Sequence, residues 1–86
     1  DVFRYLHSAP TQGFDFIFAD PPYALKELPE VPELVFKRDL LRDGGIFVME
    51  HPKRNDFSGL PYFYQHRVYG SVNFSIFIKE EEKTDA

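Results

Sequence analysis

The sequence has no cysteine and no tryptophan among its 86 residues. Without cysteine the chain cannot carry a disulfide scaffold, a thiolate metal site or a cysteine nucleophile. No apolar run approaches the roughly 20 residues that span a bilayer, so no transmembrane segment is expected. The chain opens with neither an initiator methionine nor a secretory pattern, and the default expectation is a cytoplasmic protein.

Several catalytic and binding motifs are also missing. The five glycines form no G-x-G-x-x-G and no P-loop, so the sequence encodes no phosphate cradle. No serine lies in G-x-S-x-G, which leaves a hydrolase triad without any positive signal. The three histidines, His7, His51 and His66, are expected at the surface and far apart on different elements, so no metal site is predicted.

The charge balance is acidic. A formal net charge of −4 and a pI near 5.2 argue against a chain that wraps nucleic acid by bulk electrostatics. The length and the 43% hydrophobic content predict one small globular domain at residues 1–79. Residues 80–86 are predicted to be an acidic solvated tail, which leaves room for local basic patches on the domain. Ten Phe and five Tyr are many for so small an interior, and some of them are expected to need a partner surface.

The first half of the chain contains one clear strand. Asp1 suits the N-cap of a short helix that fades before Pro10. Residues 14–19 then form a nearly continuous apolar run, a pattern typical of a parallel strand buried on both faces. Pro21 and Pro22 end this strand, because each removes a backbone donor.

The second half predicts a helix and three strands. The apolar spacing predicts a helix at 32–42 with Gly44 as its C-terminal stop, and then a strand at 46–49. The strand, helix and strand together form a βαβ unit.

A polar loop at 50–60 leads to strands at 62–69 and 72–79, which Gly70 and Ser71 join as a tight hairpin. The predicted fold class is therefore α/β, with two parallel strands joined by a crossover helix and then a β-hairpin whose last strand is antiparallel.

The tetrad Asp20-Pro21-Pro22-Tyr23 is the most informative motif, because two prolines between an acid and an aromatic rarely arise by chance. One interpretation is a rigid strand exit with Tyr23 packing on the rim. The other is a binding site, because the tetrad follows the carboxyl end of a parallel strand, where α/β sheets place their ligands.

The chemistry of the tetrad fits an amine attached to a planar ring. An ionised Asp20 can accept a hydrogen bond from an exocyclic NH₂ group, and the backbone carbonyl of Pro21 can accept a second. Two acceptors would orient the amine and turn its lone pair toward an electrophile. Tyr23 offers a face on which the ring stacks, and Pro22 fixes the turn.

Asp-Pro-Pro-Tyr after an apolar strand is the signature of amino-directed, S-adenosylmethionine-dependent methyltransferases. More narrowly, the chain resembles the C-terminal half of the bacterial small-subunit ribosomal RNA guanine-N2 methyltransferase family. The residues that carry this resemblance are Asp1–Leu6, Phe14–Tyr23, Leu41–His51 and Tyr69–Ser71.

This resemblance implies a Rossmann-like sheet ordered 3-2-1-4-5-7-6, of which the four predicted strands look like the fourth to the seventh. The family's glycine-rich loop and ribose-binding acid have no counterpart here, so the chain resembles a partial methyltransferase domain with an incomplete S-adenosyl-L-methionine site. Asp1 and Val2 match the motif at the cofactor's adenine, with a helix cap as an equal alternative for Asp1. The isolated fragment is predicted to be inactive.

Strand direction gives an argument that does not depend on the family. If the first three strands are parallel, Asp20, Glu50-His51 and Tyr69-Gly70 all emerge at one rim, where they are predicted to contact substrate. Lys53 and Arg54 follow in a loop, where they contact phosphates or are simply solvated. Glu50 can equally be a structural hydrogen-bond acceptor.

The predicted function of the intact parent is methyl transfer to an exocyclic base amine, guanine N2 in ribosomal RNA, with that RNA or a pre-assembled small ribosomal subunit as the partner. One alternative is an adenine-N6 or cytosine-N4 DNA methyltransferase. The other is a catalytically silent interaction domain whose Phe-rich surfaces bind another chain.

The strand from Phe14 to Ala19 is central in the family's sheet but is expected to become an edge in this chain. That edge is apolar and has no Lys, internal Pro or bulge to block pairing. Self-association of the fragment is therefore expected through this edge, either by antiparallel strand addition or by exchange of the N-terminal helix.

Overall fold

The computed structural model of the protein describes residues 11–22 and 26–80. The helix expected from Asp1, together with Val2 and His7, lies outside these residues. Tyr23 of the tetrad and positions 81–86 of the tail also lie outside them.

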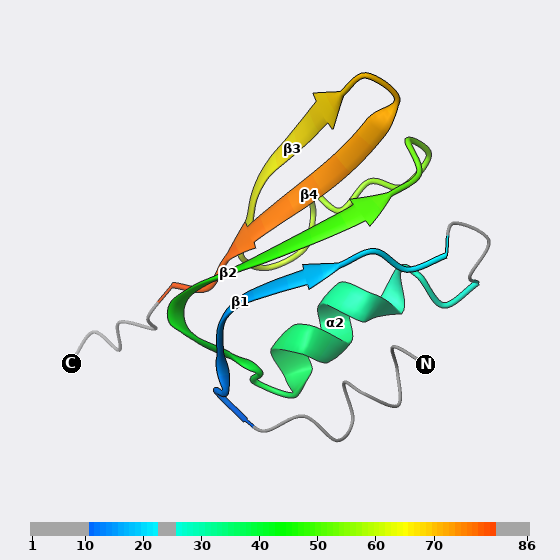
Figure 1. Ribbon diagram of the computed structural model, residues 1–86. Helices are drawn as coiled ribbons and strands as arrows, with labels where there is room; N and C mark the ends of the chain where they lie inside the picture. The colour runs from blue at the N-terminus through cyan, green and yellow to red at the C-terminus, as the bar shows by residue number, and fades with distance from the viewer. Residues whose placement is uncertain (1–10, 23–25, 81–86) are drawn as a thin grey trace.

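Four strands form one mixed sheet in the order β1-β2-β4-β3 (Figure 1). The strands are β1 (Phe14–Ala19), β2 (Leu41–His51), β3 (Phe63–Tyr69) and β4 (Val72–Ile78). β1 and β2 are parallel, whereas β4 is antiparallel to both β2 and β3. The α/β fold class is confirmed, and the strand order is the 4-5-7-6 order that the family resemblance implied.

The helix α2 (Glu30–Lys37) is shorter than the 32–42 segment predicted from apolar spacing. Asp39 adopts a left-handed conformation with φ 53°, and its N–H donates to Phe36 O. Leu40 N–H donates to Val35 O at 3.2 Å, which completes a Schellman motif. The helix therefore ends at Lys37, five residues before the predicted end at Arg42, because Asp39 takes the position after the C-cap that glycine usually occupies.

β2 is correspondingly longer than the predicted strand at 46–49. Phe14 of β1 pairs with Leu41 of β2, and the next pair is Phe16 with Ile46. Between these two pairs β2 advances by five residues, whereas β1 advances by two. A bulge is therefore present where none was expected, but the extra residues belong to β2 and not to the edge strand. At its other end β2 continues through His51, so the loop predicted at 50–60 begins later.

Gly45 in this bulge has no space for a side chain. A Cβ built there would lie 2.7 Å from the carbonyl oxygen of Arg42 and 3.2 Å from that of Asp15. Both are backbone atoms, which move less easily than a side-chain end. We expect Gly45→Ala to lower the free energy of unfolding by about 1–3 kcal/mol. Gly59→Ala is the matched control, because a Cβ at Gly59 meets nothing within 4 Å. Urea unfolding of the two variants should differ, and equal midpoints would contradict this packing account.

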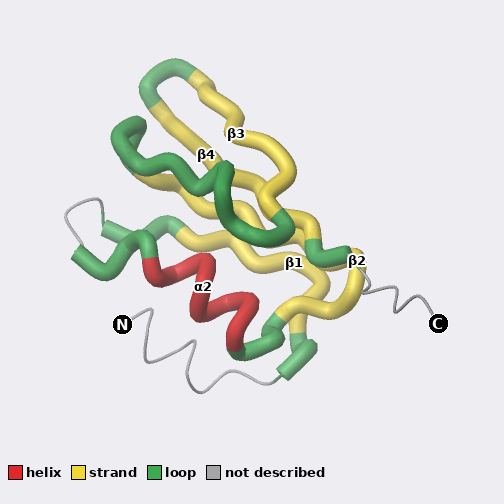
Figure 2. The backbone as a smooth tube through the Cα atoms, turned by 180° about the vertical axis from the view of Figure 1, so that it is seen from behind, coloured by secondary structure: helices red, strands yellow, loops and turns green. Residues whose placement is uncertain are grey.

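The core lies on one face of the sheet, between the strands and α2. Val31 and Val35 of the helix are fully buried against Phe47 and Phe77 of the sheet. The segment between β2 and β3 passes over the same layer and adds Phe57 to the core (Figure 2). No described helix is long and apolar enough to cross a membrane.

The other face of the sheet has no helix over it within the described residues. Strand alternation and register place a set of apolar side chains on this surface, called here the open face, and the set includes Phe16, Phe18, Ile46, Val48, Val72, Phe74, Ile76 and Ile78. Phe16 and Phe18 are 56% and 53% exposed. Within residues 11–22 and 26–80, the strand expected to be buried on both faces is therefore covered on one face only, the face against which α2 packs.

Candidate functional site

Three strands end at the same side of the sheet. β1, β2 and β3 run in one direction, so their carboxyl ends at Ala19, His51 and Tyr69 lie on one rim (Figure 1). β1 and β3 are three strand spacings apart, roughly 14 Å. The rim brings together the strand ends that the sequence argument placed there.

Asp20 is the first residue after β1, and its side chain is exposed. The next residue, Pro21, is buried, whereas Pro22 is exposed. Because Pro21 has no N–H, the ladder with β2 stops at Ala19, which pairs with Met49. The motif thus places a solvated carboxylate on an anchored backbone at the end of the sheet.

His51 is fully buried, so its predicted surface location is wrong. Its Nδ1–H donates to Pro52 O at 2.8 Å, because a carbonyl can only accept. Nε2 therefore accepts the Ser75 hydroxyl, at 2.7 Å. Both ring nitrogens are occupied within the protein, so His51 holds the start of the segment after β2 in place.

His66 lies beside His51, although the two were expected to be far apart. Their ring centroids are 5.1 Å apart, and His66 Nε2–H donates to Asn73 Oδ1 at 2.9 Å. The described residues contain no group of three or more side chains that could hold a metal ion. The burial of His51 could have been predicted from its alternation with Phe47 and Met49 along the strand. This signal was missed because the predicted strand ended at Met49.

Burial lowers the pKa of His51 below its usual value of 6.5. The unfolded chain therefore takes up a proton at a higher pH than the folded chain does. The neutral, buried His51 therefore stabilises the folded state. This stabilisation is complete above about pH 6.5 and is lost as the pH falls through the lower pKa of the folded state. We expect urea midpoints to fall between pH 7.5 and 5, and the non-titrating variant His51→Gln to lose part of that dependence. An unchanged acid slope in His51→Gln would show that another group is responsible.

An aromatic row crosses the open face near this rim. Phe18 contacts Phe74 with ring centroids 6.4 Å apart, and Phe74 contacts Tyr69 at 6.0 Å. The Arg67 guanidinium lies over the Tyr69 ring at 5.5 Å from its centroid. Tyr69 is 58% exposed, so this end of the row offers a planar surface to solvent.

The remaining predicted contacts are spread along the rim. Glu50 is half-buried beside Phe74, and Gly70 is exposed in the hairpin turn with φ 60°. Lys53 and Arg54 are exposed in the turn that follows Pro52. Sequence reasoning missed Asn55 in the same segment, whose Oδ1 is buried without a hydrogen-bond partner among the described residues.

A second polar cluster lies at the opposite end of the sheet. The Lys79 ammonium donates to Asp39, to which Gln12 also donates, and these bonds hold the pKa of Asp39 below its usual value. Lys79 Nζ also donates to Leu41 O at 2.9 Å. The cluster ties the end of the helix to the start of β2, and a polar hollow of about 440 Å³ lies beside it. It is structural and lies away from Asp20.

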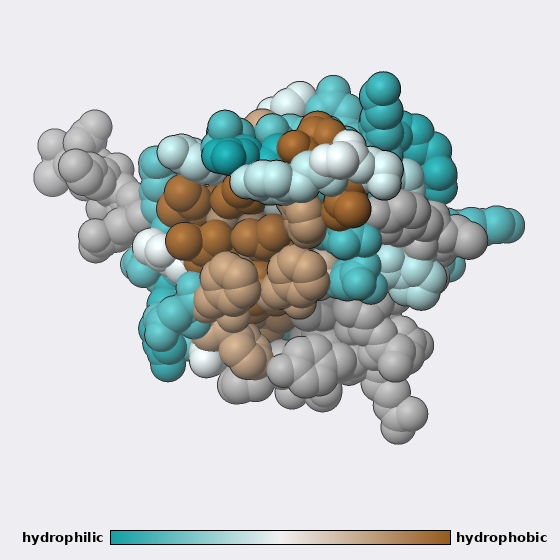
Figure 3. Space-filling view, turned by 45° about the horizontal axis from the view of Figure 1, so that its top comes forward, coloured by the Kyte–Doolittle hydropathy of each residue, from teal (hydrophilic) through white to brown (hydrophobic). Residues whose placement is uncertain are grey.

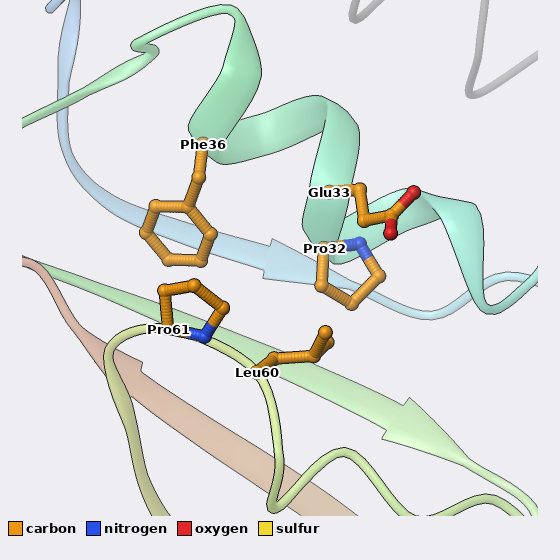
Figure 4. Close-up of a pocket in the computed structure, with 5 residues that line it drawn as sticks. All are labelled: Pro32, Glu33, Phe36, Leu60 and Pro61. Atoms are coloured by element: carbon orange, nitrogen blue, oxygen red, sulfur yellow. The ribbon is translucent and has the colours of Figure 1, made fainter.

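One apolar hollow of about 240 Å³ lies between α2 and the segment before β3 (Figure 4). Phe36 faces Pro61 across this hollow. The five residues that line it are Pro32, Glu33, Phe36, Leu60 and Pro61. It belongs to the packing of the helix layer and does not open at the strand ends.

The described residues form a parallel strand pair with a crossover helix, followed by an antiparallel hairpin that inserts its last strand beside β2. This is the arrangement expected for the C-terminal portion of a Rossmann-like sheet. The chain belongs to the family described as conserved hypothetical protein 95, which matches residues 1–78.

The chain is similar to several proteins named as methylases. It is 41% identical to "uncharacterized methylase RP545" of Rickettsia prowazekii over 44 residues. These matched residues cover 51% of this chain and 19% of that protein. Its fold is similar to that of "putative methylase HI0767" from Haemophilus influenzae, with a TM-score of 0.75 and 18% identity over 94% of this chain and 52% of the other.

A conserved hypothetical protein of Streptococcus pyogenes gives a TM-score of 0.70 at 25% identity, over 91% of this chain and 50% of the other. The chain therefore spans about half the length of these two solved structures, and its 44 matched residues cover about a fifth of the Rickettsia protein.

Proposed function

We propose that the chain is the substrate-amine half of an S-adenosylmethionine-dependent methyltransferase that modifies guanine N2 in ribosomal RNA. The observation that carries this proposal is the placement of Asp20-Pro21-Pro22 at the carboxyl end of β1, with the acid exposed and Pro21 buried. Membership of a methylase-like family supports the reaction class.

In this proposal Asp20 and the backbone of Pro21 hold the exocyclic amine. The carboxylate accepts one N–H and the carbonyl of Pro21 accepts the other, which directs the nitrogen lone pair away from both acceptors. Positioning is the main contribution, because an in-line approach of nitrogen to a methyl carbon needs orientation more than a strong base. Pro22 would fix the turn, and Tyr23 would stack on the base.

S-adenosylmethionine would supply the methyl group, and the described residues fit only part of its site. Neither β1 nor β2 is followed by a glycine-rich loop. Pro21 and Pro22 come after β1, and Pro52 comes after β2. Asp1 and Val2 are the residues proposed to meet the cofactor's adenine. The described residues thus fit the substrate side, and the contacts to the rest of the cofactor would come from outside this chain.

The proposed partner is ribosomal RNA, free or in a pre-assembled small subunit. Lys53 and Arg54 would contact phosphates, and Tyr69 with Gly70 would form the far side of the site. The exposed Tyr69 ring beside Arg67 supports stacking on a base. Glu50 would contact the substrate from β2, whereas His51 would act by holding the segment that carries the two cations.

A second candidate function is a catalytically silent interaction domain. The open face favours it, because a large exposed apolar surface on a small protein usually marks a binding surface.

The test is a methyl-transfer assay with a complete domain in which this chain is fused to the part of the fold it lacks. Radiolabelled S-adenosylmethionine is offered with deproteinised small-subunit RNA, assembled small subunits and duplex DNA. We expect label in N2-methylguanine. Label in N6-methyladenine or N4-methylcytosine would favour the DNA enzyme, and no label in any substrate would favour the interaction domain.

A further inference from the structure

Asp20 and Glu50 occupy neighbouring positions at the rim of the sheet. The parallel register pairs Ala19 of β1 with Met49 of β2, so the next residues along the two strands are Asp20 and Glu50. Neighbouring strands lie about 4.8 Å apart, a distance that one planar ring can bridge. The rim therefore presents two carboxylates, one from each strand of the parallel pair.

The two carboxylates follow strand positions that alternate in the same way. Glu50 is opposite Phe74 of β4, and alternation with the buried residues of β2 places its side chain on the open face. In β1 the exposed Phe18 is followed by the buried Ala19 and then by the exposed Asp20. Figure 3 shows apolar side chains gathered into one continuous patch on the surface of the molecule. Both carboxylates thus follow the open-face side of their strands, close to the apolar side chains of Phe18 and Phe74.

The two carboxylates differ in their contact with water. Asp20 is exposed, whereas Glu50 is half-buried. A partly buried charge loses more when a ligand offers it no hydrogen bond, because water replaces the missing donor less well. A carboxylate has about four lone-pair sites, so Glu50 can accept a bond from a ligand as well as bonds within the protein. Glu50 is therefore the better placed of the two to discriminate between ligands.

The amine alone does not identify the base. Asp20 and the carbonyl of Pro21 would hold an exocyclic NH₂ group, and guanine, adenine and cytosine each have one. Guanine alone has a ring N–H, at N1, next to that amine. Adenine and cytosine have an unprotonated ring nitrogen next to theirs, whose lone pair is an acceptor. A further acceptor beside Asp20 would therefore separate guanine from the other two bases.

We propose that Glu50 is this acceptor and selects guanine, its carboxylate accepting the N1–H while Asp20 accepts from the adjacent N2 amine. Against adenine or cytosine the same carboxylate faces a ring lone pair and loses the hydrogen bond that it makes with guanine. The inference rests on the proposed methyl transfer to a base amine and adds the residue that chooses the base.

The test compares two purines that share the 2-amino group, in the complete domain used for the methyl-transfer assay. 2-Aminopurine keeps the amine of guanine but has no N1–H. With synthetic RNAs that carry either base, we expect the domain to prefer guanine by about 10²-fold or more in kcat/KM. Glu50→Gln should reduce this preference roughly tenfold, because an amide can turn its oxygen or its NH₂ group toward the base. Glu33→Gln, an exposed glutamate on α2, is the matched control and should keep the full preference.

Nucleotide binding separates this inference from the proposed reaction. In NMR titrations of the same domain, GMP should bind more tightly than 2-aminopurine ribonucleotide, and Glu50→Gln should remove most of the difference. Glu50-dependent preference for GMP without methyl transfer to any substrate would support the inference and count against the proposed function alone.

Other results would overturn the inference. Guanine methylation with an unchanged base preference in Glu50→Gln would do so and leave the proposed function standing. An equal loss of activity on both purines would do so as well, because it would show that Glu50 only supports the fold. Equal binding of the two nucleotides to the unaltered domain would overturn it without any variant, even where circular dichroism shows that Glu50→Gln is unfolded.

Discussion

Replacing Asp20 by alanine in a complete methyltransferase domain is expected to lower turnover on RNA by about 10²-fold or more, with little change in cofactor affinity. The carboxylate addresses the substrate amine, so its loss removes one of two acceptors that orient the nitrogen. Asp20→Asn should lose less, because its amide oxygen remains an acceptor but carries no charge. Single-turnover rates measure the first effect, and calorimetry with S-adenosylmethionine measures the second.

Asp15→Ala is the control for this experiment. Asp15 lies near the other end of the same strand, has an 80% exposed side chain and forms an ion pair with Arg42 at 3.0 Å. Its removal should leave turnover close to that of the unaltered domain. Tyr23→Phe should also be mild, because it keeps the ring. Near-normal turnover by Asp20→Ala would show that the tetrad only ends the strand.

The second large effect is expected from the isolated chain, which should neither methylate RNA nor bind S-adenosylmethionine well. The 86 residues contain no glycine-rich loop of the kind that holds such a cofactor. Contacts at the adenine alone would leave most of the cofactor in solvent. We expect a Kd weaker than about 10 μM, which corresponds to roughly −7 kcal/mol.

Calorimetry with the isolated chain measures this directly, and the fused complete domain is the control that should bind. A Kd tighter than about 10 μM for the isolated chain would mean that its own residues hold more of the cofactor than we assign to them. Restored binding after addition of the complementary half would locate the missing contacts in that half.

The sequence was sufficient where local rules agree. The run at Phe14–Ala19 ends at two prolines, and the Gly70 and Ser71 turn joins two strands of the right length, so β1 and the hairpin were predicted within a residue or two. The boundary between α2 and β2 was wrong because two signals competed. Gly44 fitted a helix stop, but Asp39 ended the helix first, and Gly44 with Gly45 was needed for the bulge.

The candidate site was predictable only in part for a similar reason. Asp20 is recognisable from its neighbours in the chain, because the two prolines define its backbone. The pair of His51 and Ser75 is not, because their hydrogen bond joins residues 24 positions apart across antiparallel strands. Register decides that contact, and register is set by the whole sheet rather than by either residue alone.

The strand order also bears on how the protein is made. β4 is the last strand in the chain, yet it lies between β2 and β3 and pairs with both. During synthesis β2 leaves the ribosome well before its second neighbour, β4, exists, and β3 has no strand to pair with until β4 has emerged. Apolar strands therefore stay open to other chains until β4 has emerged. A truncation only a few residues before Ile78 would therefore do more damage than the number of residues removed implies, because it would shorten the strand that holds the two parts of the sheet together.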